Sequence, residues 1–397
     1  MTAHVCSAAD PAALLAQIDA LRGGAFRPTL AVVFCSPDWD AQALADALAA
    51  RHLAVVGTST AGEIAGAAIT EGGCSVMLCD PAADAFALWS EPRADGETMR
   101  DVAVRLGAAA AARFEDPVVL AFASGVATTD GESVVQGVRA GAGGPVPLFG
   151  GLAADDLRMA ETRVIGGDAV HADGLAALVL DGARYHAEGL ATSGWQPVGV
   201  AKTVTRADGN AVFELDGESV LDVYGRYLDM GDLRGSGTSI AMDLGVQYPI
   251  LVERADGTAV IRAPLMSDPE TDALIFAGTV AEGASVRFCI PPSLDVVDRV
   301  IDEAGALRAR APDADAVLLI SCKARHTALG PIVEDEVEGL AEVWDAPMAG
   351  YFSYGEFGGA HGGAEGPGRG ESDFHNETCS LVAIREVPRA EGAPARG

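Results

Sequence analysis

The sequence has few lysines, no paired cysteine motif and no long apolar run, and each of these absences removes a class of function. Its 27 basic residues face 57 acidic residues, and Lys202 and Lys323 are its only lysines. A formal charge of −30 repels nucleic-acid phosphates and anionic lipids, so we expect neither nucleic acid nor membrane as a partner. No apolar run approaches the roughly 18–20 residues that span a bilayer, and we expect no export signal. These features predict a cytoplasmic protein.

Cysteine and histidine are dispersed along the chain. The seven cysteines show no CxxC spacing and lie mostly in apolar runs, which predicts reduced, buried thiols in a cytosol. The seven histidines show no HxxxH or HxH spacing, so no metal site is predicted. A GxSxG nucleophile elbow is also absent. With 397 residues, 49% of them hydrophobic, the chain is long enough for about two globular domains.

Short apolar runs alternate with alanine-rich amphipathic stretches, a pattern typical of an α/β fold. The order strand, helix, strand and glycine occurs three times, over residues 29–57, 117–151 and 315–350. A further apolar strand follows each copy, at 74–79, 174–180 and 378–384. The segments that lead into the second and third copies, FALWSEP (86–92) and VRFCIPP (286–292), also match. We infer internal duplication of this unit.

The copies also share individual positions. A small hydroxyl or thiol ends the first strand, a glycine ends the second strand, and an acid follows six positions later. These positions are Ser36, Ser124 and Cys322, then Gly57, Gly150 and Gly350, then Glu63, Asp156 and Glu356. We expect Gly57 to superpose on Gly350 and Glu63 on Glu356, with these acids and Gly355 in turns at strand ends, because glycine permits positive φ or close backbone approach. Their structural role would be to accept backbone N–H bonds or to cap a helix.

The duplication predicts two β/α domains with mixed sheets, partly related by the repeated strand–helix–strand–Gly unit. We place these domains at residues 28–217 and 218–386, with the linker near the helix expected in 218–231. The glycine-rich stretch 358–372 predicts a loop without regular structure, and 387–397 predicts a disordered tail.

Two loops at strand ends are candidates for a ligand site, because ligands of open α/β sheets bind beyond the carboxyl ends of strands. The loops are SCKARHTALG (321–330) and GYFSYGEF (350–357), and a third segment precedes the last strand. Arginine suits a ligand carboxylate and an acid suits an ammonium group, unless Arg325 and Glu356 simply pair with each other. The candidate ligand-binding residues are Cys322, Arg325, Ser353, Tyr354, Glu356, His375 and Asn376.

A catalytic alternative uses the same segments. Cys322, His375 and Glu356 would form a Cys–His–acid set for acyl transfer, as in a cysteine-dependent amidase or acyltransferase. Ser36 and Ser124 stand at the positions that correspond to Cys322, which favours a shared structural role for a small polar strand end. We therefore expect no enzyme activity and assign no catalytic residue.

Several motifs, taken in order, resemble the bacterial FIST sensory family. They are GTSTAGEI (57–64), FGGLAADD (149–156), GWQPVGVAKTVTRADGNAVFELDG (194–217), SCKARHTALG (321–330), GYFSYGEFG (350–358) and FHNETCSLVAI (374–384). The resemblance covers about residues 28–386 and both the N-terminal and the C-terminal FIST domain. The glycine-rich stretch 358–372 and the absence of a fused output module depart from the family's pattern.

The resemblance implies an intracellular sensor of a small polar ligand, with amino acids proposed. It implies signalling through histidine kinases, cyclic-di-nucleotide enzymes or chemotaxis-type proteins, here as a separate partner chain. Some relatives are described as haem proteins that sense nitric oxide. No cofactor is assured, but if haem binds this chain, His375 and His326 are the expected ligands.

Overall fold

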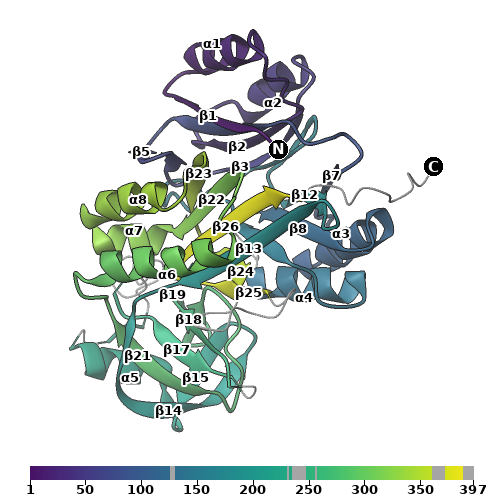
Figure 1. Ribbon diagram of the computed structural model, residues 1–397. Helices are drawn as coiled ribbons and strands as arrows, with labels where there is room; N and C mark the ends of the chain where they lie inside the picture. Colours follow the sequence, from purple (N-terminus) through teal and green to yellow (C-terminus); the bar gives the residue numbers. More distant parts are fainter. Residues whose placement is uncertain (126–129, 230–231, 235–246, 255–256, 360–371, 388–397) are drawn as a thin grey trace.

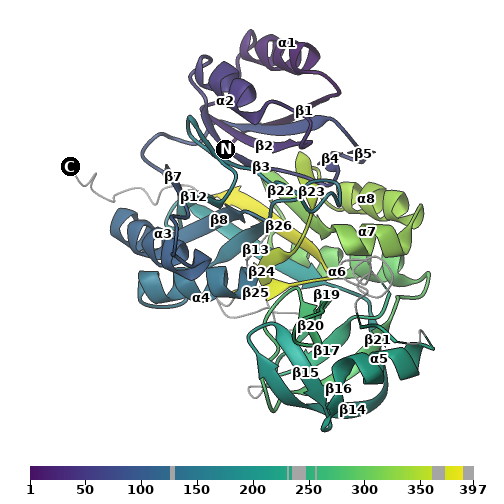
Figure 2. The same ribbon diagram turned by 180° about the vertical axis from the view of Figure 1, so that it is seen from behind.

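The computed structural model describes residues 1–125, 130–229, 232–234, 247–254, 257–359 and 372–387. The described strands form three six-stranded sheets and one eight-stranded sheet, with helices on the outside (Figures 1 and 2). Most sheets mix parallel and antiparallel pairs, and the architecture confirms the predicted α/β fold class.

The first sheet is built mainly by the N-terminal residues. Its apolar central strand is buried along its whole length and pairs in parallel with the next strand, across a helix that Asp40 caps. The elements of this copy are β1 (Ala3–Ala8), α1 (Pro11–Arg22), β2 (Leu30–Cys35), α2 (Ala41–Ala49), β3 (Ala54–Ser59) and β6 (Cys74–Cys79).

The second and third copies repeat this order. The second contains β7 (Phe86–Pro92), α3 (Met99–Arg113), β8 (Pro117–Ala123), α4 (Gly131–Ala142), β9 (Leu148–Leu152) and β12 (Gly174–Asp181). The third contains β13 (Tyr185–Thr192), α6 (Val296–Arg310), β22 (Ala316–Cys322), α7 (Lys323–Leu329), α8 (Ile332–Val343), β23 (Met348–Ser353) and β26 (Cys379–Glu386). The strand orders β1-β6-β2-β3, β7-β12-β8-β9 and β13-β26-β22-β23 are equivalent, which confirms the internal duplication.

Each copy also contributes a short hairpin to the sheet of another copy. The hairpin of β4 (Glu63–Ala65) and β5 (Ala68–Thr70) leaves the first copy and pairs with β23. The hairpin of β10 (Val164–Gly166) and β11 (Ala169–His171) leaves the second copy and pairs with β3. The hairpin of β24 (Glu356–Gly359) and β25 (Ser372–His375) leaves the third copy and pairs with β9. The exchange is cyclic, so the three sheets interlock.

One apolar core lies between the three sheets. Phe34 from the first sheet, Phe122 from the second and Tyr351 from the third meet there, with ring centroids 5.0 to 6.1 Å apart. Helices cover the outer faces, with α1 and α2 on the first sheet, α3 and α4 on the second, and α6 and α8 on the third. Because both faces of each sheet are covered, polar side chains lie mainly at the carboxyl ends of the parallel strands.

The aligned glycines have one physical cause. Gly57, Gly150 and Gly350 each lie opposite a residue of the neighbouring parallel strand, in equivalent register. A Cβ atom on them would approach a carbonyl oxygen of that strand to 2.0, 2.0 and 1.8 Å respectively. The shared register confirms that Gly57 corresponds to Gly350.

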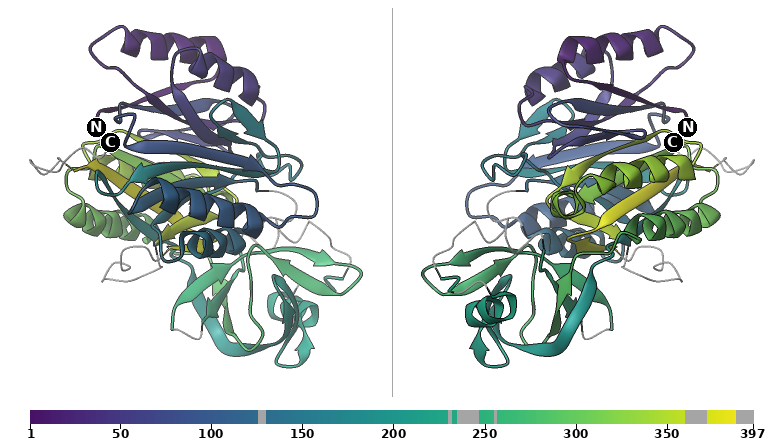
Figure 3. Two further views of the ribbon diagram at one scale, coloured as in Figure 1. Left: turned by 90° about the vertical axis from the view of Figure 1, so that its right-hand side faces the viewer. Right: turned by 90° about the vertical axis from the view of Figure 1, so that its left-hand side faces the viewer.

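An insertion interrupts the third copy between β13 and α6. It forms the eight-stranded sheet, here called the insertion sheet, which stands apart from the other three sheets in Figure 3. Its elements are β14 (Gln196–Asp208), β15 (Ala211–Leu215), β16 (Glu218–Ser219), α5 (Val220–Leu228), β17 (Ile250–Glu253), β18 (Ala259–Arg262), β19 (Pro264–Asp268), β20 (Ala273–Phe276) and β21 (Ser285–Ile290).

The insertion corrects one sequence match. Residues 286–292, which we aligned with 86–92, end the insertion sheet, and β13 is the strand that corresponds to β7. The boundary expected at 217/218 falls between β15 and β16, which pair with each other. The loop expected at 358–372 joins β24 to β25, and its residues 360–371 lie outside the described residues, as do residues 388–397 of the tail.

All seven cysteines are buried, as the apolar runs around them predicted, and none is in a disulfide in the structure. Within the described ranges, no helix is both long and apolar enough to cross a bilayer.

Candidate functional site

The three copies build equivalent strand ends. In each sheet the residue at the end of the first strand donates its backbone N–H to the carbonyl of a residue beside the start of the last strand. The pairs are Ser36 with Gly73 (2.9 Å), Ser124 with Gly174 (3.0 Å) and Cys322 with Thr378 (2.9 Å). These bonds give a common reference for comparing the side chains around them.

Glu63 opens β4 and is fully buried. Its carboxylate accepts hydrogen bonds from Thr60 Oγ1 at 2.6 Å, from the Gly73 backbone N–H at 3.0 Å and from Thr70 Oγ1 at 3.3 Å. Burial outweighs these bonds and, with a smaller contribution from Asp156, raises the pKa of Glu63 to about 7.

Glu356 opens β24 and has the same surroundings as Glu63. It accepts hydrogen bonds from the Ser353 hydroxyl, three residues earlier, and from Thr378 Oγ1 at 2.7 Å. Burial raises the pKa of Glu356 to about 8. The backbone register supports the expected match between Glu63 and Glu356, although both residues begin hairpin strands rather than standing within turns.

The second copy departs from this pattern. The carbonyls of Gly62, Arg163 and Gly355 accept equivalent bonds from the neighbouring sheet, so Val164 stands where the other copies have Glu63 and Glu356. Asp156 instead lies in a turn of a longer loop before β10, with φ at 56°. The alignment of Asp156 with the two glutamates is therefore wrong, because extra residues precede this hairpin.

Asp155 organises that longer loop. Its buried carboxylate accepts the backbone N–H groups of Met159 at 3.0 Å, Ala160 at 2.7 Å and Glu161 at 3.0 Å. It also accepts the hydroxyl of Tyr354. Tyr354, from the third copy, therefore helps to hold the loop before β10 in the second copy.

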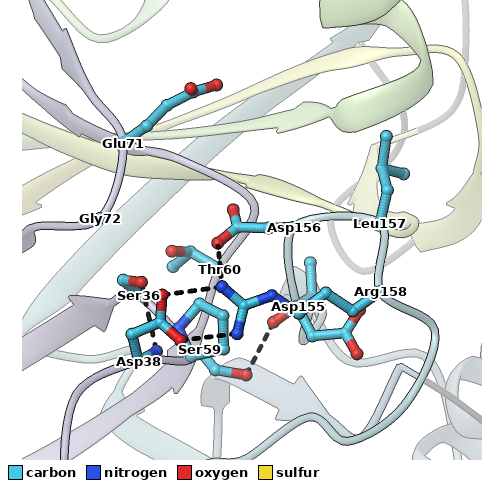
Figure 4. A network of polar contacts seen from close by, with 12 residues as sticks. Ser36, Asp38, Ser59, Thr60, Glu71, Gly72, Asp155, Asp156, Leu157 and Arg158 are labelled. Carbon is cyan, nitrogen blue, oxygen red and sulfur yellow. Dashed lines mark hydrogen bonds and ion pairs between the residues drawn. The ribbon is translucent and has the colours of Figure 1, made fainter.

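Two acids near the carboxyl end of β2, in the first copy's sheet, share a basic partner. Figure 4 shows the Arg158 guanidinium between the carboxylates of Asp38 and Asp156. Arg158 contacts Asp38 through two hydrogen bonds of 2.6 and 2.7 Å and lies 3.8 Å from Asp156. These groups are partly exposed, so both charge compensation and solvent stabilise them.

The acid at the second strand end is also paired. Asp173, immediately before Gly174, accepts hydrogen bonds from Arg93 at 3.1 and 2.5 Å and from Ser124 Oγ at 3.2 Å. The corresponding residue of the first copy is Gly72, and that of the third copy is Glu377.

Glu377 has no such basic partner within the described ranges. It is fully buried, and among the described residues neither of its carboxylate oxygens has a hydrogen-bond partner. Its φ of 57° lies in the left-handed region, where the first copy has Gly72 at 79°. Glycine adopts this conformation without strain, so a glutamate here carries a backbone cost that its side chain must offset.

Arg325 does not neutralise this acid by direct contact. Its guanidinium binds the carboxylate of the equally buried Glu336 and the carbonyl of Ser193. The pairing of Arg325 with Glu356 that we considered is therefore wrong. Burial and the nearby Glu356 raise the pKa of Glu377 well above its ordinary value, and the more distant charge of Arg325 lowers it by less.

Two further buried polar atoms near Arg325 and Glu377 lack a described partner. They are Asn376 Oδ1, an acceptor, and Trp195 Nε1, a donor. The Arg325 guanidinium lies 5.9 Å over the Trp195 ring, and Asn376 adjoins Glu377. We call Trp195, Arg325, Asn376 and Glu377 the orphan cluster. Buried polar groups are almost always satisfied in native proteins, by the protein itself or by ordered water, so this concentration marks the orphan cluster as a candidate site.

Two family models match the chain over most of its length. The FIST N domain matches residues 29–218 and the FIST C domain matches residues 221–359. The chain belongs to the FIST family. No curated protein matches it. FIST domains are sensory domains, so a buried site for a small molecule is the feature that this fold is expected to contain.

The histidines suggested for haem do not fit that group as placed. His375 is buried in β25, and its Nε2 lies 2.9 Å from the Gly359 carbonyl. His326 stacks on Phe352 at 4.1 Å, with Nδ1 3.1 Å from Lys323 Nζ, and burial lowers the pKa of His326 to about 4. A surface hollow of about 530 Å³ lies between the start of α2 and the hairpin of β10 and β11, but within the described ranges its lining contains no histidine.

The FIST strand end therefore brings together part of the set expected from sequence. Cys322 and Ser353 lie beside Glu356, and Asn376 lies beside the preceding Gly355. Arg325 is nearby, while Tyr354 and His375 are bonded elsewhere. Sequence reasoning missed three residues of this site, which are Trp195, Glu336 and Glu377. Only Glu377 had a signal, because an acid stands there in place of Gly72 of the first copy.

Proposed function

We propose that this FIST chain is a cytoplasmic sensor whose ligand is a small polar molecule with a protonated amine, bound by the orphan cluster. The observation that carries the proposal is the buried carboxylate of Glu377, which has no hydrogen-bond partner in the part of the chain that the structure describes. Burial disfavours the ionised form of this carboxyl group, and a bound cation would favour that form by compensating its charge.

The donors and acceptors of the cluster support an ammonium group. Glu377 and Asn376 offer acceptors, and an ammonium group supplies three donors and a positive charge. The charge of Arg325 is already matched by Glu336, so a bound ammonium group would be the cation that favours ionisation of Glu377, whose pKa burial raises. Trp195 Nε1 and the guanidinium N–H groups that Arg325 does not use would suit a second, electron-rich part of the ligand. Amino acids, the ligands implied by family resemblance, have both features.

Catalysis by Cys322 has less support. Burial beside Glu356 and Glu377 raises the pKa of the Cys322 thiol well above its ordinary value, and the thiolate is the reactive form. Seven buried thiols suit a reducing compartment. As the output of the sensor we propose a separate signalling protein, of the histidine kinase or cyclic-di-nucleotide enzyme classes.

The test compares ligand binding in two matched variants by calorimetry and thermal shift. Ethylammonium chloride, glycine and L-alanine are titrated at neutral pH, with sodium acetate as the anion control. Glu377→Gln should weaken binding of the amines about tenfold or more, since a charge-assisted hydrogen bond contributes about 1.5–3 kcal/mol.

Asp173→Asn is the matched control at the equivalent position of the second copy. It breaks the pair with Arg93 and should lower the stability of the protein while leaving amine affinity unchanged. Amine affinity that survives Glu377→Gln, or acetate that binds as well as the amines, would overturn the proposal. Mass spectrometry of the intact protein under native conditions, purified from its own cells, would identify the natural ligand.

A further inference from the structure

The orphan cluster is buried at the junction between the insertion sheet and the rest of the molecule. Trp195 lies on the link into the insertion sheet and packs with Ile261 and Cys289 of that sheet and with Ala328 of α7. Cys289 is fully buried, and the charge of Glu377 is close enough to contribute to the raised pKa of its thiol. Glu377 therefore lies close to the place where the insertion sheet meets the rest of the molecule.

The connections of the insertion sheet allow it to pivot. The chain enters through residues 193–195 and leaves through residues 291–295. Gln196 and Ile290, the residues beside these links, are paired in adjacent antiparallel strands. Entry and exit thus lie side by side, as the two connections of a hinge do.

Polar contacts fix the insertion sheet to the body on the side of β25. Arg262, at the end of β18, is fully buried and donates to Glu132 Oε2 at 2.6 Å and to the Phe374 carbonyl at 3.1 Å. Arg254 donates to Glu132 Oε1 at 3.2 Å and to Asp373 Oδ1 at 2.8 Å. Charge-assisted bonds of this kind are the strong ones in proteins.

The same contacts reach the ligand site through β25. Phe374, whose carbonyl Arg262 holds, is two residues before Asn376 and three before Glu377. Its ring fills the space beside Gly355, where a Cβ atom would come within 2.4 Å of the ring, and Gly355 precedes Glu356. The position of the insertion sheet and the position of the Asn376–Glu377 turn are therefore linked by packed, hydrogen-bonded neighbours.

We propose that the insertion sheet is a lid over the orphan cluster and that Arg262 is the latch that holds it closed. The lid rests on the proposed function for what it covers, since it controls entry of the amine ligand. Opening would expose Cys289 and Cys322 together, while the core of the first sheet would stay closed. Ligand binding would favour the closed lid, because both parts then contact the ligand.

Thiol labelling tests the lid in the ligand-free protein. The chain is exposed to N-ethylmaleimide, and peptide mass spectrometry follows Cys289 and Cys322, with Cys35 and Cys74 of the first sheet as reporters of global unfolding. Arg262→Met should speed labelling of Cys289 and Cys322 about tenfold, the equivalent of one charge-assisted hydrogen bond, and leave the reporters unchanged. Equal acceleration at all four cysteines, or none, would overturn the lid.

Two further variants keep the test decisive. Glu132→Gln weakens the same latch from the body side and should give a smaller rise in the same direction, and it decides the matter alone if Arg262→Met does not fold. Arg226→Met removes an arginine whose partner, Glu218, lies within the insertion sheet, and it should leave all labelling rates unchanged. A rise at Cys289 and Cys322 in the Arg226 variant would show that the latch is not special and would overturn the proposal.

An arm with ligand separates the two proposals. Saturating ethylammonium chloride should slow labelling of Cys289 and Cys322 in the unmodified chain. If Arg262→Met speeds labelling of Cys289 and Cys322 alone but the amine gives no protection, the lid proposal is supported and the amine site is refuted. If the amine binds through Glu377 while Arg262→Met changes no rate, the sensor proposal stands and the lid falls.

Discussion

Glu63 should make the stability of the protein fall as the pH rises from about 4.5 to about 7. The ordinary pKa of a glutamate is 4.5, and burial raises that of Glu63 to about 7. Below pH 4.5 the carboxyl group is protonated in both the folded and the unfolded chain. Between the two values the unfolded chain releases the proton and the folded chain retains it, so folding becomes less favourable. At about 1.4 kcal/mol for each pH unit, the loss amounts to about 3 kcal/mol.

Replacing Glu63 with glutamine should remove this part of the pH dependence. The amide keeps the size of the side chain and an acceptor for Thr60, but it does not titrate. Urea unfolding followed by circular dichroism, between pH 4.5 and pH 8, gives the free energy of unfolding for each variant. The difference between Glu63→Gln and the unmodified protein should grow by about 3 kcal/mol across this range.

Glu71→Gln is the matched control, because Glu71 follows the same hairpin but its side chain is 66% exposed. Its unfolding curve should run parallel to that of the unmodified protein. If the Glu63→Gln curve is parallel as well, the carboxyl group of Glu63 is already ionised in the folded protein at low pH, and burial does not dominate its titration.

Alanine at Gly57, Gly150 or Gly350 should each destabilise the protein by about 2 kcal/mol or more, because the added Cβ would overlap a backbone carbonyl. Gly305→Ala, at an exposed position of α6 with open space around it, should instead stabilise by about 0.5–1 kcal/mol, and thermal unfolding of all four variants would show whether close approach is the cause. Cys322→Ser should leave thermal stability and ethylammonium binding nearly unchanged, because the other copies carry serine there; lost binding in a folded variant would return the thiol to the centre of the function.

Much of the fold could be predicted because its central strands are buried on both faces. The run LAVVFC in β2 is apolar throughout, as is β8, and β22 is apolar except for Ser321. The glycines could be aligned because one steric contact recurs in each copy. The hairpins could not, since strands such as β4 and β10 are three residues long and pair with another copy. Their partners depend on tertiary contacts that no local pattern records.

The site was harder to predict than the fold. Arg325 was a sound candidate from its loop, but Glu336 lies one helical segment further on, and a buried arginine takes the nearest buried carboxylate. Residues 286–292 resemble 86–92 because both precede a helix, although one segment belongs to the insertion sheet. The sequence signal at Glu377, an acid in place of Gly72, could be recognised only once the sheets had aligned the two positions and its oxygens proved to lack partners among the described residues.

The exchange of hairpins decides when each sheet can close during synthesis of the chain. The first sheet lacks its outer pair of strands until residue 171 has been made, and the second lacks its outer pair until residue 375. Until then β3 and β9 present unpaired edges, which favour association with other chains. A chain that ends between residues 171 and 375 would therefore have a complete first sheet and an incomplete second sheet, and almost the whole sequence must be made before all three sheets are complete.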